Sequence, residues 1–249
     1  MKKRFFAICL SLLLISLLLC SCNGDDAAAS TVSPVTKATA TTAESTAETT
    51  SAIKRHVPKF EEIDLSDANI EDFEASEEET DYVLISIEGY GDILVRLFPE
   101  VAPQTVANFK MLVANRFYDG LIFHRVIEGF MIQGGGITAD FYQKPANVIA
   151  GEFASNGFEN NLLHVEGVLS MARTNAPNSA TSQFFIMHKT SPHLDGEYAA
   201  FGYAAAGRDV VDAIAKCEKG YNNIPVQNVV ITSARFVKAK ASVETTNAS

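Results

Sequence analysis

The chain has 249 residues, of which 47% are hydrophobic, and it carries a formal net charge of −10 at pH 7. A chain of this length accommodates one good-sized domain with appendages, or two small domains. An acidic chain lacks the basic face that a nucleic-acid partner requires, and it would not dock electrostatically on anionic lipid. We therefore expect no nucleic-acid partner.

The first residues have the pattern of an export signal. Cations at positions 2–4 precede an apolar run over residues 5–19. A run of about fifteen residues fits a signal peptide and is short for a membrane-spanning helix, which needs about twenty. We therefore predict that residues 1–21 are a signal peptide.

A cysteine motif follows this run directly. Leu19-Cys20-Ser21-Cys22 resembles the lipobox of bacterial lipoproteins, in which a small residue precedes the cysteine that is acylated. Cys22 fits better than Cys20, because Ser21 is small whereas Leu19 is bulky, and two acyl chains would anchor the protein stably. We expect Cys22 to carry lipid and the protein to be exported, attached to the bacterial cell membrane and facing outward. The alternative is an ordinary secretory signal followed by an incidental cysteine.

Two segments of low apolar content come next. Residues 22–52 are rich in Ala, Thr and Ser without apolar periodicity, which is typical of a disordered tether. Residues 53–80 are strongly acidic, with apolar side chains such as Phe60, Ile63 and Phe73 spread thinly among them. We interpret residues 53–80 as a solvated acidic extension in preference to an element that docks on the domain.

A folded domain is predicted over residues 81–238, before a polar tail at 239–249. Alternating apolar residues over 83–87 and 93–97, separated by glycines, predict a β-hairpin. Pro103 opens a segment with apolar residues at helical spacing, which predicts a helix of about twelve residues. A second helix is predicted over 208–216.

The remaining apolar runs are short and are broken by Gly, Asn and Pro. They cover residues 122–127, 131–133, 167–171, 183–187 and, at the end of the domain, 226–237. Many short strands with two isolated helices favour a β-barrel over a sheet built from βαβ units.

Three segments carry specific motifs: FHRVIEGFMIQGG at 123–135, GVLSMAR at 167–173 and SQFFI at 182–186. Together with LDG at 194–196 and FG at 201–202, in this order and spacing, they resemble the cyclophilin family closely over about residues 81–238. The resemblance implies a mainly β fold, a closed eight-stranded antiparallel β-barrel capped by two α-helices. It also implies peptidyl-prolyl cis-trans isomerase activity on proline-containing polypeptides.

The resemblance assigns site residues as well. The family's catalytic arginine falls on Arg125, and Gln133 matches the glutamine that helps to hold this arginine and the substrate backbone. The other matched positions line the proline pocket (Phe130, Met131, Phe185 and Leu194) or the groove for residues preceding proline (Ala172, Asn175 and Gln183).

Two positions and the length of one segment depart from the commonest eukaryotic form of the family. The segment around Asn175 is one residue longer, His193 stands where many members have tryptophan, and Tyr198 stands where many have histidine. The resemblance still places His193 and Tyr198 at the substrate site. Because the tryptophan position matters for the inhibitor cyclosporin, we expect weakened cyclosporin binding with activity retained.

The residue types suit this reaction. Rotation about an X–Pro bond makes and breaks no covalent bond, so no nucleophile, metal or cofactor is required. A guanidinium at Arg125 would donate a hydrogen bond to the prolyl nitrogen, which regains its lone pair in the twisted transition state. We expect a monomeric enzyme that assists exported proteins to fold at the membrane surface. The alternatives are a module that binds proline segments with little catalysis and a solute-binding lipoprotein, although the latter needs a larger two-lobed body.

Overall fold

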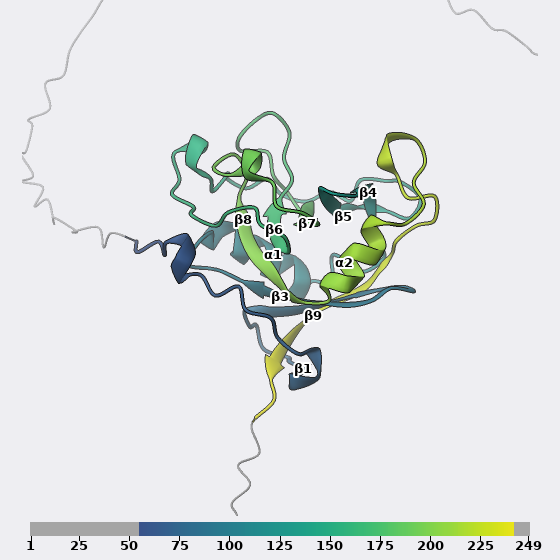
Figure 1. Cartoon of the computed structure of the whole chain (residues 1–249), viewed down its shortest axis with the longest axis horizontal. Coiled ribbons are helices and arrows are strands. Elements are labelled where there is room, and N and C mark those ends of the chain that lie inside the picture. Colours follow the sequence, from purple (N-terminus) through teal and green to yellow (C-terminus); the bar gives the residue numbers. More distant parts are fainter. Residues whose placement is uncertain (1–54, 242–249) are drawn as a thin grey trace, which may run out of the picture. The chain divides into compact units, whose positions relative to one another are not determined.

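A nine-stranded antiparallel sheet is the frame of the computed structural model, which describes residues 55–241 (Figure 1). Its strands are β1 (Phe73–Ala75), β2 (Tyr82–Ile87), β3 (Gly91–Leu97), β4 (Leu121–Ile127), β5 (Met131–Thr138), β6 (Val168–Met171), β7 (Phe184–Met187), β8 (Ala200–Ala206) and β9 (Ile231–Ala239). Neighbouring strands follow the order β1-β9-β2-β3-β8-β6-β7-β5-β4. The predicted signal peptide, the lipid-bearing Cys22 and the tether lie outside the described residues.

Two helices accompany the sheet, α1 (Pro103–Ala114) and α2 (Arg208–Ala215). Both were predicted and are confirmed, with Pro103 in the first turn of α1, where its missing N–H costs no hydrogen bond. The predicted hairpin is confirmed as β2 and β3. Within residues 55–241, neither helix is long and apolar enough to cross a membrane.

The prediction of a closed eight-stranded barrel is wrong in strand number and in closure. The sheet ends at β1 and β4. Between the β4 end of the sheet and the segment that leads into β9, the described chain forms no ladder. It forms an isolated bridge (Ile122 to Val230) and two backbone hydrogen bonds, from the Phe123 N–H to the Val229 carbonyl and from the Gly120 N–H, just before β4, to the Ile231 carbonyl. The closing strand, predicted to start at Val226, starts at Ile231, because residues 226–228 turn outward and are exposed.

A first hydrophobic cluster fills the space between the sheet and the two helices. The inward residues of β2, Val83, Ile85 and Ile87, belong to it, as do Phe109 of α1 and Ile214 of α2. Alternation along the strand and helical spacing along α1 and α2 place these side chains on one side of each element. The apolar residues whose spacing predicted these elements are therefore also the residues that form this cluster.

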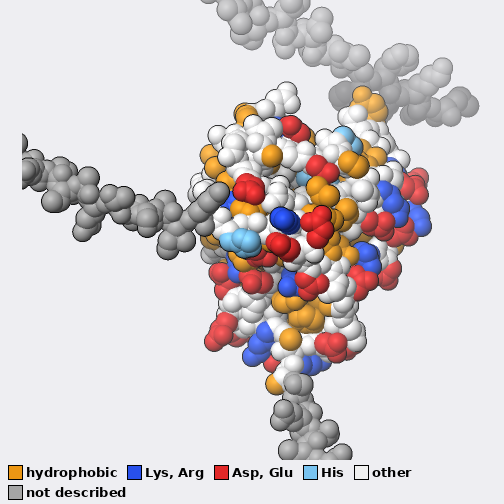
Figure 2. Space-filling view, turned by 60° about the vertical axis from the view of Figure 1, so that its left-hand side comes forward, with side chains coloured by type: hydrophobic (Ala, Val, Ile, Leu, Met, Phe, Trp, Pro, Cys, Tyr) orange, Lys and Arg blue, Asp and Glu red, His pale blue; other side chains and the backbone are white. Residues whose placement is uncertain are grey.

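Residues 55–75, here called the N-terminal strap, pack on the domain, so the interpretation of a solvated extension is wrong. Ile63 is 8% exposed, and β1 at the end of the strap pairs with β9. Some of its acidic side chains pair with cations: Asp64 pairs with Arg96, and an Asp67 carboxylate oxygen lies 2.5 Å from Arg208. On the face in Figure 2, acidic side chains are interspersed with Lys and Arg side chains.

A second hydrophobic cluster joins this strap to the strands beneath it. It includes Ile63 and Phe98 together with Met131, Phe185 and Leu194, three residues that the sequence assigned to a substrate pocket. The strap thus packs on the same cluster that lines the candidate site.

Candidate functional site

A cavity of about 340 Å³ opens where β4, β5, the end of β6, β7 and the loop before β8 meet. Ten residues line it: Arg125, Phe130, Met131, Gln133, Ala172, Arg173, Phe185, His193, Leu194 and Tyr198. All of them except Arg173 were predicted from the sequence.

Arg125 is held by a chain of side-chain hydrogen bonds that crosses the sheet. Arg125 on β4 lies opposite Gln133 on β5, and its Nη1 donates to Gln133 Oε1 at 3.2 Å. Gln133 Nε2 donates in turn to Gln183 Oε1 at 3.0 Å. A Cβ at Gly136 would lie 2.3 Å from Gln183 Cγ, so glycine there leaves room for this side chain. The guanidinium is thus oriented while it stays exposed to solvent.

The opposite wall of the cavity is apolar. Met131, Phe185 and Leu194 form its buried base, with exposures of 2%, 5% and 7%. Phe130 stacks on His193, with ring centroids 5.7 Å apart. The cavity therefore pairs a polar, cation-bearing side with a ring-sized apolar base.

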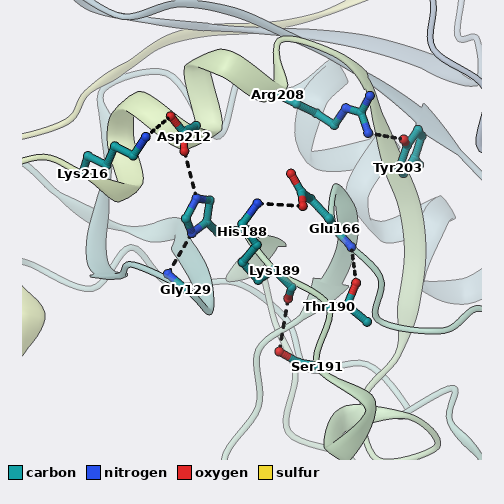
Figure 3. Close-up of polar contacts among 10 residues, drawn as sticks. All are labelled: Gly129, Glu166, His188, Lys189, Thr190, Ser191, Tyr203, Arg208, Asp212 and Lys216. Atoms are coloured by element: carbon teal, nitrogen blue, oxygen red, sulfur yellow. Dashed lines mark hydrogen bonds and ion pairs between the residues drawn. The ribbon is translucent and has the colours of Figure 1, made fainter.

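The β4–β5 turn that carries Phe130 is tied to α2 (Figure 3). Gly129, whose φ is 79°, donates its N–H to His188 Nδ1 at 2.8 Å. Because Nδ1 accepts, the neutral ring carries its proton on Nε2, which lies 3.1 Å from Asp212 Oδ1. Hydrogen bonds from Lys216 and His188 lower the pKa of Asp212. This network fixes the turn and, with it, the position of Phe130.

A second buried histidine lies behind the apolar wall. His164 stacks on Phe185 with ring centroids 6.1 Å apart, and its two nitrogens lie 3.0 Å from Asp195 Oδ1 and 3.0 Å from Ser170 Oγ. Burial lowers the pKa of His164, and the opposing effect of Asp195 does not restore it. The ring is therefore neutral at neutral pH and supports Phe185 as a packed, hydrogen-bonded element.

Two residues differ from the sequence assignment. Asn175 is exposed in the loop after β6 and does not line the cavity. Arg173, which the sequence analysis missed, does line it and stacks over Tyr198 at 4.6 Å. Its position directly after Ala172 in the second motif was the available signal. The Arg173 Nε and Nη2 atoms donate to the Glu197 carbonyl, at 3.0 and 2.9 Å, and this fixes the guanidinium.

Gln183 lies beside the main cavity and lines a neighbouring one of about 200 Å³. Gln133, Ala172 and Arg173 line both cavities, so the two are continuous. The structure thus brings Ala172 and Gln183 together, as predicted, and leaves Asn175 outside.

The chemistry available at the cavity is hydrogen-bond donation beside an apolar pocket. Its lining contains two guanidinium groups and no carboxylate. Within residues 55–241, no group of three or more His, Cys, Asp or Glu residues is arranged to hold a metal ion. Such a site suits a neutral ligand with an apolar ring and adjacent carbonyl groups.

Comparisons with known proteins agree with this geometry. The family model described as cyclophilin type peptidyl-prolyl cis-trans isomerase/CLD matches residues 82–236. Peptidyl-prolyl cis-trans isomerase cyp18 of Streptomyces antibioticus is 44% identical over 159 residues, which cover 59% of this chain and 93% of that protein. Peptidyl-prolyl cis-trans isomerase B of Escherichia coli is 40% identical over 156 residues, covering 58% and 93%.

A solved structure has a similar fold. The crystal structure of a Cryptosporidium parvum cyclophilin type peptidyl-prolyl cis-trans isomerase, determined in the presence of the dipeptide Ala-Pro, aligns with a TM-score of 0.54 at 30% identity. The alignment covers 62% of this chain and 98% of that one.

Proposed function

The chain belongs to the cyclophilin-type peptidyl-prolyl cis-trans isomerases, and we propose that it isomerises X–Pro bonds of exported proteins in the cavity around Arg125. The observation that carries this proposal is the hydrogen-bonded row Arg125–Gln133–Gln183 beside the buried apolar base. The Ala-Pro dipeptide present with a related isomerase supports a proline-containing ligand.

Arg125 acts on the nitrogen of the bond that rotates. The barrier to rotation is about 18–20 kcal/mol because the planar amide is stabilised by resonance. As the bond twists, the prolyl nitrogen regains its lone pair and accepts a hydrogen bond that the planar amide barely accepts. A guanidinium beside that nitrogen therefore stabilises the transition state more than the ground state.

Arg125 cannot supply the whole acceleration. Shortening an uncatalysed time of about 10–100 s to around a millisecond needs a factor of about 10⁵, or roughly 7 kcal/mol. A hydrogen bond to a charged group contributes about 1.5–3 kcal/mol. The remainder comes from the apolar base, which holds the proline ring still while the preceding carbonyl swings and which favours the less polar twisted amide.

Cyclosporin is expected to bind weakly. His193 is exposed at the rim of the cavity and stacks on Phe130, at the position where many family members have tryptophan. An imidazole offers less apolar area and no indole N–H, so a large cyclic ligand loses contact there. A small peptide held by the cavity base loses less contact than a large cyclic ligand does.

The proposal that the enzyme works on exported proteins depends on the N-terminal sequence. A cationic start, an apolar run and Cys22 after a small residue support export followed by lipid attachment. We expect mass spectrometry of the protein from a bacterial membrane fraction to find a diacylated Cys22 at the new N-terminus. A Cys22→Ser protein that stays in the membrane fraction with the same processing would contradict the anchor while leaving the isomerase assignment intact.

The catalytic assignment is tested by isomerisation of a short X–Pro peptide, followed by NMR exchange with the full chain in detergent. We expect Arg125→Ala to lower kcat/KM by about 10²-fold or more, as removal of a transition-state donor does. Lys189→Ala is the matched control, because it removes an exposed cation outside the cavity lining. Circular dichroism verifies that each variant is folded.

One result would overturn the assignment of Arg125, and another would overturn the proposed cellular function. If Arg125→Ala and Lys189→Ala isomerise the peptide equally well, Arg125 is not catalytic. If Arg125→Ala protein is inactive but fully replaces the natural protein in cells, the cellular function is binding of proline segments, with catalysis incidental.

A further inference from the structure

We propose that a second groove beside Arg125 binds an apolar side chain of the substrate residue that follows proline. This inference rests on the proposed function of the Arg125 cavity and adds a specificity to it. The groove has a volume of about 280 Å³ and is lined by His124, Arg125, Ile137, Phe141, Asn222 and Ile224.

Arg125 connects the groove with the main cavity, because it is the one residue that lines both. In the sheet order β7-β5-β4, the row of side chains runs from Gln183 beside β7 to Gln133 on β5 and Arg125 on β4. The groove continues this row past β4, towards the turn that contains Asn222.

A bound polypeptide must leave the proline pocket in two directions. The residues before proline are proposed to lie along Ala172 and Gln183, in the cavity that shares three residues with the proline pocket. That cavity shares no lining residue with the second groove. The chain after proline therefore leaves across Arg125, and its first side chains meet the groove.

The residues that line the groove favour binding of an apolar side chain. Ile137, Phe141 and Ile224 supply the contact surface, and Phe141 is 54% exposed. Tyr142, Tyr221 and Val226, close in sequence to lining residues, are also among the large hydrophobic side chains exposed in residues 55–241. A groove lined by three apolar side chains is typical of a site that binds an apolar group.

The one permanent charge in the groove is that of Arg125. Burial, together with the nearby Arg125 charge, lowers the pKa of His124, so this ring is neutral at neutral pH. The guanidinium suits the carbonyl groups of a peptide backbone, while the rest of the lining suits a leucine or phenylalanine side chain.

Both walls of the groove have a fixed backbone conformation. Phe141 and Asn222 have φ angles of 64° and 59°, which non-glycine residues rarely adopt. Around Phe141, the Thr138 N–H donates to the Tyr142 carbonyl, and the Phe141 N–H donates to the Thr138 carbonyl, both at 2.9 Å. Asn228 Nδ2 donates to the Ala139 carbonyl at 2.9 Å and so links the segment after Ile224 to the segment before Phe141. Unusual backbone conformations held by their surroundings are typical of ligand-binding sites.

The test compares peptides of the form Ala-Ala-Pro-X with X as Phe, Leu or Gly, using NMR exchange and the full chain in detergent. We expect kcat/KM to be about tenfold higher for Phe and Leu than for Gly, equivalent to about 1.4 kcal/mol. Phe141→Gly and Ile224→Ala should each bring this ratio close to one. Glycine at 141 tolerates the positive φ and so preserves the turn. Val148→Ala, which truncates a side chain that is 67% exposed outside the groove, is the control and should keep the ratio.

The outcomes separate the two proposals. If the wild type isomerises the Gly peptide but shows no preference for Phe or Leu, the groove inference is wrong and the isomerase site stands. A preference that survives in both folded groove variants also refutes it. If the wild type isomerises none of the peptides, the proposed site itself fails, and the groove inference falls with it.

Discussion

The two hydrophobic clusters of this protein have different origins and different roles. The first lies between the sheet and the helices, and its members come from elements with clear apolar periodicity, such as β2 and α1. The second combines Ile63 of the strap with Met131, Phe185 and Leu194 at the base of the cavity. Loss of packing in the first should therefore weaken the fold alone, whereas loss in the second should also change the site.

The largest expected effect on stability is at the centre of the first cluster. Phe109 is fully buried and packs against three aromatic rings, those of Tyr118, Phe184 and Phe201, with centroids 5.1, 5.6 and 5.2 Å away. Phe109→Ala should lower the free energy of unfolding by about 3–5 kcal/mol in urea titrations. Peptide isomerisation per folded molecule should not change.

Met111→Ala on the same helix is the control for this experiment, because Met111 is 44% exposed. Its expected cost is within about 0.5 kcal/mol. Equal losses in the two variants would show that the first cluster is not centred on Phe109.

In the second cluster we expect a smaller loss of stability, together with a change in KM. Ile63→Ala removes a buried strap side chain and should cost about 2 kcal/mol, the low end for such truncations, because the site can relax at the surface. The KM for a proline peptide should rise as Met131 and Phe185 lose packing. Leu163→Ala, at a side chain 38% exposed, is the control. An unchanged KM in a destabilised Ile63→Ala protein would show that the packing of the strap does not affect the site.

The smallest expected effect concerns the charges of the strap. Hydrogen bonds from Ser66 and from the Arg96 guanidinium lower the pKa of Asp64 from 3.8 to about 2. Since the pKa is lowered on folding, the contribution of Asp64 is present above pH 3.8 and is lost as the pH falls through about 2.

Asp64→Asn should therefore reduce stability at pH 7 by less than about 1 kcal/mol, because the pair is exposed and screened. The difference from the wild type should shrink as the pH falls below 4 in urea titrations, and added salt should reduce it at pH 7. A difference that grows towards low pH would contradict this assignment.

The sequence predicted the parts of the fold that depend on local patterns. Alternation along β2 and β3 and the helical spacing after Pro103 were sufficient for the hairpin and α1. The Ala-rich strand β8 was missed, since alanine and glycine are poor strand formers and only pairing with β3 and β6 makes this segment extended. β1 was missed for a similar reason, because three residues form a strand only through pairing with β9.

The residues of the candidate site were predicted from motifs, but the surroundings of the site were not. Arg125 and the apolar base matched motif positions, which fix residue types at known places. The second groove depends on the backbone at Phe141 and Asn222 and on segments about 80 residues apart, which no local pattern encodes. Asn175 lies in an exposed loop after β6, and only the structure gives the course of this loop.

The pairing of β1 with β9 also bears on solubility. The last residues of β9, Val237–Ala239, pair with Phe73–Ala75, whereas the pairing of β9 with β2 ends at Phe236. Unpaired strand edges offer free N–H and C=O groups to other chains and promote aggregation. The strap covers this edge with a short strand flanked by acidic residues, and this should prevent edge-to-edge association. A chain trimmed to begin at Tyr82 would expose both this edge and the apolar surface under Ile63, and it should aggregate during refolding.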